Sequence, residues 1–432
     1  MYRGIARRLI PSALTAASLT AAGEACGAGF ALAEQSASGM GNAFAGAAAS
    51  AQDASTIYFN PAGMGLLPGA QVVVAGHAVD FRAEFSDSGS SLPPAGGGLL
   101  PVGSTNPDAG GTLFIPNAYF ALPLGEKLAF GVGVNAPFGI KTEYDDPWIG
   151  RFQGINSDLT TYNINPAMSF KISEAFIIGL GVNWQHADAE LTNAVILGPA
   201  TEGMAKVEAD GDAWGWNAGV LFSLGQDMRI GVSYRSALDY TLEGITTVTT
   251  LAGAVVSAAS GPTSIDVTFP DSASVSVVQK FGPQWELLGD VTWTHWSEIG
   301  TVQAIDSTTG APRDVLDFQF DDAWRVSLGA NYYHGDRWTL RGGLAWDQSP
   351  VQDQFRTVRL PDADRIWVSL GARWKASNGL FVDVGYAHVF VDDAPINLSR
   401  SQLPVSAATT SVVNGSYESS VDILSLQVGY TF

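Results

Sequence analysis

Apolar and polar residues alternate with a period of two from about residue 70 to the C-terminus, and this alternation constrains the fold more than any other feature. Successive side chains of a β-strand point to opposite faces, so the pattern predicts strands with one apolar and one polar face. At the C-terminus the apolar face is made of Leu424, Leu426, Val428, Tyr430 and Phe432. The residues between them are Ser425, Gln427, Gly429 and Thr431. An all-β chain is therefore expected.

The connections between the strands favour a membrane barrel over a soluble β-sandwich, which also alternates. Short connections, such as Ser173-Glu174, take turns with long ones, such as 83–111 and 191–210. Outer-membrane barrels have an even number of strands, short turns at one end, long loops at the other, and aromatic residues at the ends of their apolar faces. The sequence predicts a 14-stranded antiparallel transmembrane β-barrel with strands near 70–82, 112–124, 127–140, 158–173, 175–190, 211–225, 227–243, 264–281, 284–302, 316–334, 336–348, 363–376, 379–391 and 417–432.

Composition excludes several other classes of protein. Beyond the N-terminus, no apolar stretch reaches the about 18 residues that a membrane helix needs. The formal net charge of −20 would repel a polyanion, so nucleic-acid binding is not expected. The 5 histidines are scattered without ligand spacing, and the single cysteine forms no Cys-based site, so the sequence predicts no metal site and no cofactor.

Residues 1–27 have the organisation of a secretory signal peptide. Arg3, Arg7 and Arg8 precede an apolar stretch that is too short to span a bilayer, and small residues end the segment near Gly27. Cys26 belongs to this segment, with a lipoprotein acylation site as the alternative. The predicted location is the outer membrane of a Gram-negative type of cell.

Residues 28–69 are expected to form a plug inside a barrel made of residues 70–432. This segment is rich in Gly and Ala and lacks strand alternation. A barrel of fourteen strands leaves an open lumen unless something fills it. The alternative, a disordered periplasmic tail, would leave Phe30, Phe44, Tyr58 and Phe59 exposed.

Several motifs give the chain a resemblance to a known family. In the first part of the predicted mature chain these are Ala28-Gly29-Phe30-Ala31-Leu32, Ser38-Gly39-Met40-Gly41, Asp53-Ala54-Ser55-Thr56 and Asn60-Pro61-Ala62-Gly63-Met64. Further along they are Ala136-Pro137-Phe138-Gly139, Trp214-Gly215-Trp216-Asn217 and Pro361-Asp362-Ala363-Asp364-Arg365. Together they resemble the FadL/toluene-transporter (TodX-like) family of outer-membrane proteins over essentially the whole mature chain.

The resemblance implies passive uptake of long-chain fatty acids or of aromatic or aliphatic hydrocarbons through a plugged barrel. It implies that Phe30 lies at a ligand pocket and that Asn60, Pro61 and Ala62 form the plug motif. It also implies a lateral exit where the third strand kinks, at Pro137, Phe138 and Gly139. Pro lacks a ladder donor and Gly weakens a strand, so these residues suit a gap, or a simple bulge. The gap is expected to face Asn60–Ala62.

The ligand class stays open at this stage. Family members that take up fatty acids hold the carboxylate with basic side chains, and the resemblance places Asn193 and Leu316 at those positions. Arg313 is near the second position and is the candidate carboxylate contact. Burying a carboxylate without a paired cation is costly, so the sequence favours a neutral hydrocarbon unless the site is rearranged.

Two other function classes remain as alternatives, an outer-membrane barrel enzyme of the phospholipase type and a general porin. A catalytic serine motif is lacking, so the chain is not expected to be an enzyme. Its expected partners are the hydrophobic substrate, outer-membrane lipid and lipopolysaccharide, and a monomer is expected. Acidic pairs such as Asp321-Asp322 are solvated loop tips or, alternatively, bridge to lipopolysaccharide through divalent ions.

Overall fold

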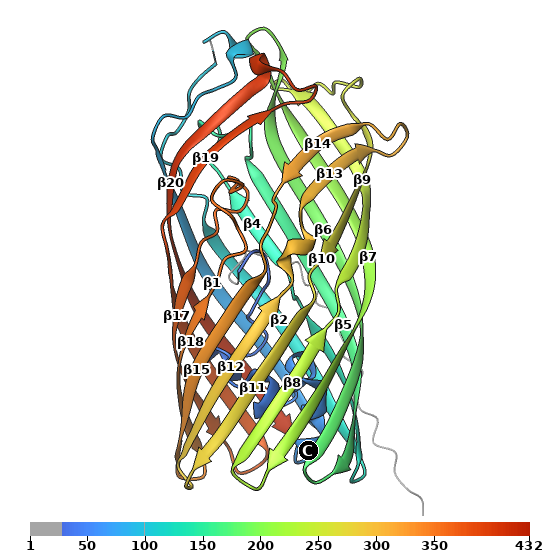
Figure 1. Ribbon diagram of the computed structural model, residues 1–432, viewed down its shortest axis with the longest axis vertical. Coiled ribbons are helices and arrows are strands. Elements are labelled where there is room, and N and C mark those ends of the chain that lie inside the picture. Colours follow the sequence, from blue (N-terminus) through green and yellow to red (C-terminus); the bar gives the residue numbers. More distant parts are fainter. Residues whose placement is uncertain (1–27, 99) are drawn as a thin grey trace, which may run out of the picture.

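The protein is a closed β-barrel with helical segments inside its lower half (Figure 1). The computed structural model describes residues 28–98 and 100–432. The predicted signal peptide, with Cys26, therefore lies outside the described residues. Within the described part of the chain, no helix is long and apolar enough to cross a bilayer.

The helices and strands have the following bounds. The helical segments are α1 (Ala37–Met40), α2 (Ala47–Ser50), α3 (Thr56–Phe59), η1 (Pro61–Leu66), η2 (Pro94–Gly96), η3 (Trp296–Glu298) and η4 (Ala407–Thr409). The strand segments are β1 (Gln71–Asp87), β2 (Gly111–Leu124), β3 (Leu128–Asn135), β4 (Gly139–Glu143), β5 (Asn156–Ser173), β6 (Phe176–Gly198), β7 (Thr201–Leu224), β8 (Met228–Arg235), β9 (Leu238–Thr250), β10 (Gly261–Phe269), β11 (Ser272–Phe281), β12 (Trp285–Thr294), β13 (Thr301–Asp306), β14 (Pro312–Asp317), β15 (Ala323–His334), β16 (Trp338–Asp347), β17 (Arg365–Lys375), β18 (Leu380–Val391), β19 (Ala394–Ser401) and β20 (Thr410–Thr431).

These segments make fourteen antiparallel barrel strands, which confirms the predicted fold. Six of the fourteen are interrupted and appear as the pairs β3/β4, β8/β9, β10/β11, β12/β13, β14/β15 and β18/β19. The circle closes because β1 pairs with β2 on one side and with β20 on the other, from Gln71↔Thr431 to Asp87↔Gly415. Closure leaves no long edge that could pair with another chain.

The prediction of a loop over 191–210 was wrong. There, β6 runs on to Gly198 and β7 begins at Thr201, so the two strands form one long hairpin. Above the membrane both faces of a strand can meet water or a cavity, so apolar and polar residues need not alternate there. A method that relies on alternation therefore ends these strands too early.

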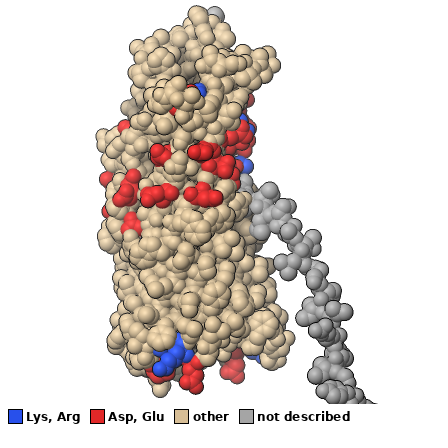
Figure 2. Space-filling model, turned by 90° about the vertical axis from the view of Figure 1, so that its right-hand side faces the viewer, with Lys and Arg blue, Asp and Glu red and all other residues tan. Residues whose placement is uncertain are grey.

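The two faces of each strand meet different surroundings. On β20, Leu426 is 54% exposed on the outside, while its neighbour Gln427 is fully buried inside the barrel. The face in Figure 2 has a broad band without Lys, Arg, Asp or Glu, bounded by acidic side chains above and charged side chains below. An apolar band flanked by polar edges is what lipid requires of a barrel exterior.

The helical segments α1, α2, α3 and η1, which belong to the predicted plug of residues 28–69, lie in the lower half of the lumen, and glycines in the wall let this part of the chain come close (Figure 1). A Cβ at Gly219 would lie 2.0 Å from Oδ1 of Asn60, and one at Gly231 would lie 2.0 Å from the carbonyl oxygen of Ala48. Real side-chain carbons do not approach other atoms so closely. Part of the unusual Gly content therefore serves contact between wall and plug.

Buried ion pairs hold this plug to the wall. Arg373 of β17 contacts Asp53 of the plug and Asp383 of β18, and Arg341 of β16 donates to Asp383 at 2.7 Å. Arg341 also donates to the side chain of Gln52 at 2.7 Å. Burial alone would raise the pKa of the Asp53 carboxyl, but Arg373 and the hydroxyl of Ser55 outweigh it and lower that pKa. The plug is thus anchored through charges that have no access to water.

Candidate functional site

A one-residue bulge interrupts the barrel wall between β3 and β4. Pairing with β5 stops at Asn135↔Asn163 and resumes at Gly139↔Thr160. Between these two pairs, the kinked strand has 4 residue steps, from 135 to 139, whereas β5 has 3, from 163 to 160. The inserted residue lies within Ala136-Pro137-Phe138, where Pro lacks a ladder donor and disturbs pairing.

The bulge opens a gap between β2 and β4. The pairing of β2 with β3 ends at Ala118↔Val134, and no described residue of β4 pairs with the rest of β2. Above the gap the wall closes again, since the backbone N–H of Glu143 donates to the carbonyl oxygen of Ala109. The wall therefore has a bounded opening beside Pro137, Phe138 and Gly139.

The first residues of the plug satisfy the backbone groups at this opening. The N–H of Leu32 donates to the oxygen of Pro137 at 2.8 Å, and the N–H of Gly139 donates to the oxygen of Phe30 at 2.9 Å. The hydroxyl of Thr161 donates to the oxygen of Phe138 at 2.6 Å. Irregular backbone at membrane depth is tolerated only where protein or water covers it, and here the plug covers it.

The expected position of the plug motif opposite the gap was wrong. Asn60 lies against β7, where its amide donates to the carbonyl oxygen of Val220 and, within the plug, to that of Ala48. Its Oδ1 accepts from the N–H of Ala62, and Pro61 is the first residue of η1. The motif does form a rigid turn. The plug residues that face the gap are instead residues 30–35, which come earlier in the chain.

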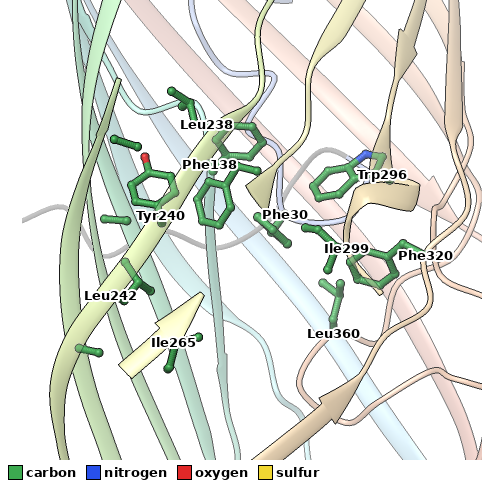
Figure 3. Packing of buried hydrophobic residues seen from close by; sticks show 14 of the residues in the cluster. Phe30, Phe138, Leu238, Tyr240, Leu242, Ile265, Trp296, Ile299, Phe320 and Leu360 are labelled. Carbon is green, nitrogen blue, oxygen red and sulfur yellow. The ribbon is translucent and has the colours of Figure 1, made fainter. Parts of the chain in front are cut away.

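Phe30 is the centre of an aromatic cluster at the level of the gap (Figure 3). Its ring centroid lies 4.8 Å from that of Trp296, 5.1 Å from that of Phe269 and 5.8 Å from that of Phe138. These rings come from the plug, η3, β10 and the bulge. Sequence reasoning identified Phe30 and Phe138 but not Phe269 or Trp296, because the four residues meet only after the barrel closes.

Three cavities follow one another from the outer end of the barrel to this cluster. The outer cavity, of about 680 Å³, lies among the loops and is lined by residues such as Phe152, Val248 and Arg313. Below it, an apolar pocket of about 130 Å³ shares Val207 and Asp314 with the outer cavity and ends at Phe30.

The remaining residues that line the apolar pocket are mostly aliphatic. They include Ile140, Leu159, Leu191, Leu242, Ile265, Val267, Ile299, Val302 and Leu316. Beyond Phe30 lies a chamber of about 190 Å³, which is lined by Pro137 and Phe138 on one side and by polar side chains of β8, β11, β12 and β15 on the other. The aromatic cluster therefore separates the apolar pocket from the chamber beside the gap.

Basic side chains occur at the upper end of the apolar pocket, but Arg313 is not the one that lines it. Arg313 lines the outer cavity and forms an ion pair with Asp306. Arg359, from the segment before β17, lines the apolar pocket. Sequence reasoning missed Arg359, whose only local signal is a lone cation between Val358 and Leu360.

A buried carboxyl lies in the plug near the gap. Glu34 is fully buried, and neither of its carboxyl oxygens has a hydrogen-bond partner among the described residues. Burial raises the pKa of Glu34 to about 7, although Arg325 and Arg365 act to lower it. Among the described residues, no group of His, Cys, Asp and Glu side chains is arranged to hold a metal ion.

Comparisons with known proteins agree with this architecture. Residues 18–432 match the family model described as outer membrane protein transport protein (OMPP1/FadL/TodX). Outer membrane protein P1 of Haemophilus influenzae is 33% identical over 417 residues, covering 88% of this chain and 89% of that protein. The long-chain fatty acid transport protein of Salmonella typhi is 29% identical over 413 residues, covering 89% and 93%.

A solved structure shows the same fold. The crystal structure of a Pseudomonas aeruginosa FadL homologue superimposes with a TM-score of 0.87 at 22% identity, covering 94% of this chain and 100% of that one. The family match extends over nearly the whole chain, and the predicted resemblance and outer-membrane location are confirmed. The chain belongs to the OMPP1/FadL/TodX family of outer membrane transport proteins.

Proposed function

We propose that this protein takes up hydrophobic molecules, long-chain fatty acids or hydrocarbons, by passive diffusion across the outer membrane. The molecule enters the outer cavity, binds in the apolar pocket, passes the aromatic cluster and leaves sideways through the gap between β2 and β4. The observation that carries this proposal is the position of the apolar pocket, which lies between a cavity open to the loops and an opening in the wall.

The plug favours the sideways exit over a downward one. Passage to the periplasmic end would have to separate Arg373 from Asp53, and breaking a buried ion pair costs about 3–5 kcal/mol. Moving a ligand with roughly 400 Å² of apolar surface into water would also cost about 10 kcal/mol of free energy, at about 25 cal/mol per Å². Leaving directly into the bilayer avoids both costs.

Phe30 is proposed as the gate between the apolar pocket and the gap. The pocket volume of about 130 Å³ is below the roughly 300–1,000 Å³ of typical small-molecule sites, so a long ligand needs side chains to move. Phe30 belongs to a segment that is held to the bulge by two backbone hydrogen bonds, to Pro137 and Gly139. Release of this segment would enlarge the pocket and uncover the gap together.

The sideways exit is tested by deleting Pro137. The bulge has one residue more than β5 requires, so removing one residue restores a continuous register from β3 to β4 and allows pairing with β2. We expect uptake of a radiolabelled hydrophobic substrate by cells to fall to background, while the purified variant still binds that substrate. Deletion of Gly98, an exposed loop residue with open space around it, is the matched control.

Substrate uptake at the wild-type rate by the Pro137 deletion, with a closed wall verified by a crystal structure, would refute the sideways exit. Passage through the plug would then be the better account. If neither the wild type nor the control binds or takes up any hydrophobic substrate, the proposed function itself is wrong.

Further parts of the proposal concern partners and chemistry. We propose a monomer, whose apolar band contacts membrane lipid and whose acidic side chains above that band contact lipopolysaccharide. We also propose that the protein is a transporter without enzymatic activity, so that purified protein releases no fatty acid from phospholipid. Steady ion conductance of the intact protein in planar bilayers would instead indicate a general porin.

A further inference from the structure

The barrel wall has a second interruption near its outer end, between β14 and β19. Among the described residues, β14 pairs only with β13 and β19 only with β20, and no backbone hydrogen bond joins β14 to β19. The next strand, β15, meets the wall lower down, since its pairing with β12 ends at Thr294↔Ala323, before β13 begins. Both β14 and β19 lie on the near side of the barrel in Figure 1, and no near strand lies between them. The outer end of the wall therefore has two free strand edges.

One side chain supplies the ties across this break. Nη2 of Arg400 on β19 contacts the carboxylate of Asp314 on β14 and donates to the backbone oxygen of Val315 at 3.5 Å. Among the described residues, no other hydrogen bond joins 312–317 to 392–416. The side chains of Arg400 and Asp314 are 17% and 28% exposed, so salt screens their attraction only in part. This ion pair holds together two strand edges that the backbone leaves apart.

The two sides of the break are held to the rest of the protein to different extents. On the β19 side, Nη1 of Arg400 donates to the backbone oxygen of Gln153 at 2.8 Å, and the amide of Gln153 donates to the backbone oxygen of Leu398 at 2.8 Å. On the other side, the β13–β14 hairpin pairs with β10 over three residues of each strand. Segments with few ties open locally at a low cost in free energy. The β13–β14 hairpin is therefore the side that moves when the ion pair separates.

The ion pair lies where the outer cavity and the apolar pocket meet. Asp314 and Val207 line both of these cavities, so they border the passage between them. Arg400 lines the outer cavity. A molecule that moves inward must pass between Val207 on β7 and the carboxylate that Arg400 holds. Outward movement of the β13–β14 hairpin would carry Asp314 away from Val207 and widen the passage.

We propose that the Arg400–Asp314 ion pair is a latch that closes the passage between the outer cavity and the apolar pocket. The latch opens when the β13–β14 hairpin moves away from β19. This inference rests on the proposed function, because it concerns the step by which a hydrophobic molecule reaches the apolar pocket. The latch is distinct from Phe30, which lies at the inner end of that pocket. The pocket then has a gate at each end.

The first test measures the width of the break and needs no ligand. Spin labels on Gln303→Cys and Ser399→Cys, two exposed positions on β13 and β19, report the distance across the break by pulsed electron paramagnetic resonance. The single cysteine of the sequence, Cys26, lies in the predicted signal peptide. Adding Arg400→Gln should increase the population with a longer distance about tenfold, which is what a hydrogen bond between charged groups is worth.

Lys206→Gln is the matched control for this measurement. Lys206 of β7 contacts Glu190 of β6 at 2.9 Å, so it also forms an ion pair between two strands of the upper wall. Backbone pairing already joins β6 to β7 at this level. The variant should therefore keep the distance distribution of the wild type.

The second test follows transport in cells. Arg400→Cys combined with Asp314→Cys removes the ion pair, so the initial rates of uptake of radiolabelled dodecane and laurate should rise several-fold. Joining the two substituted positions with a short bismaleimide should reduce uptake to background. N-ethylmaleimide modifies each position without joining them and should not reduce uptake. Opposite effects in one variant distinguish a latch from a contact that only stabilises the fold.

Equal distance distributions in wild type and Arg400→Gln would overturn the inference, as would uptake that cross-linking leaves unchanged. If Arg400→Gln does not fold, the labelled wild type decides, because salt at about 1 M screens a partly exposed ion pair and must increase the population with the longer distance. If wild type takes up neither dodecane nor laurate, the proposed function is wrong, while the distance measurement still decides whether the ion pair holds the break closed.

Discussion

Replacing Phe30 by alanine should release the first residues of the plug from the gap without affecting the barrel. Phe30 is 9% exposed and contacts three other rings, so the change leaves a cavity that the surrounding wall cannot fill by collapsing. Phe-to-Ala changes at buried sites cost about 3–5 kcal/mol. An equilibrium constant changes tenfold for about 1.4 kcal/mol. A loss of about 3 kcal/mol in the free energy that holds the segment at the gap therefore increases the population of the released segment about a hundredfold.

Hydrogen–deuterium exchange measures this release directly. Peptides that cover residues 28–36 should exchange about a hundredfold faster in Phe30→Ala, because the N–H groups of residues such as Leu32 lose their partners at the bulge. Strands β16–β18 should exchange as in wild type. Ligand affinity should fall about tenfold, because the apolar pocket loses its floor.

The control for this prediction is Phe85→Ala. Phe85 is also buried and packs against Trp148 and Tyr417, in a cluster that contains no residue of the plug. It should leave exchange over residues 28–36 unchanged. Unchanged exchange in Phe30→Ala, or equal acceleration by both variants, would refute the view that Phe30 fastens the plug to the gap.

Two further predictions concern the plug. Arg373→Met leaves the buried carboxylates of Asp53 and Asp383 with one guanidinium fewer, at a cost of about 3–5 kcal/mol, so planar-bilayer recordings should show ion conductance that wild type lacks. If Arg373→Met shows no ion conductance, other contacts are sufficient to hold the plug in place. For Glu34, burial raises the pKa from 4.5 to about 7, so plug docking is strongest below pH 4.5 and weakens by about 3 kcal/mol as the pH rises to 7. Glu34→Gln should remove this dependence from exchange over residues 28–36, and identical pH profiles in both proteins would contradict the assignment.

Local pattern was sufficient to predict the wall. Alternation is set by the geometry of each strand and by lipid outside it, so it can be recognised within a few residues, as in Leu424 to Phe432. The same reasoning failed over 191–210, where strands leave the membrane and the difference between the two faces disappears. The kink at Pro137 was implied by the family resemblance, and Pro suits it because Pro lacks the donor that a ladder needs.

The candidate site depended on contacts between distant segments. Arg313 and Arg359 look alike in the sequence, and only the folded structure shows that Arg313 forms an ion pair with Asp306 while Arg359 lines the apolar pocket. The sequence also did not determine how the plug lies in the barrel. In the structure, Asn60–Ala62 lies against β6 and β7, and Phe30 lies at the gap.

The sequence by itself determined the fold class, the number of strands and the outward faces, because each follows from the short-range geometry of a strand in lipid. Tertiary structure alone decided the one-residue register shift against β5, the aromatic cluster that covers it and the position of Arg359 at the apolar pocket. Those features depend on which side chains the closure of the barrel brings within a few ångströms of one another. Residues 30, 138, 269 and 296 meet at one point, although their separation in the chain gives no local sign of it.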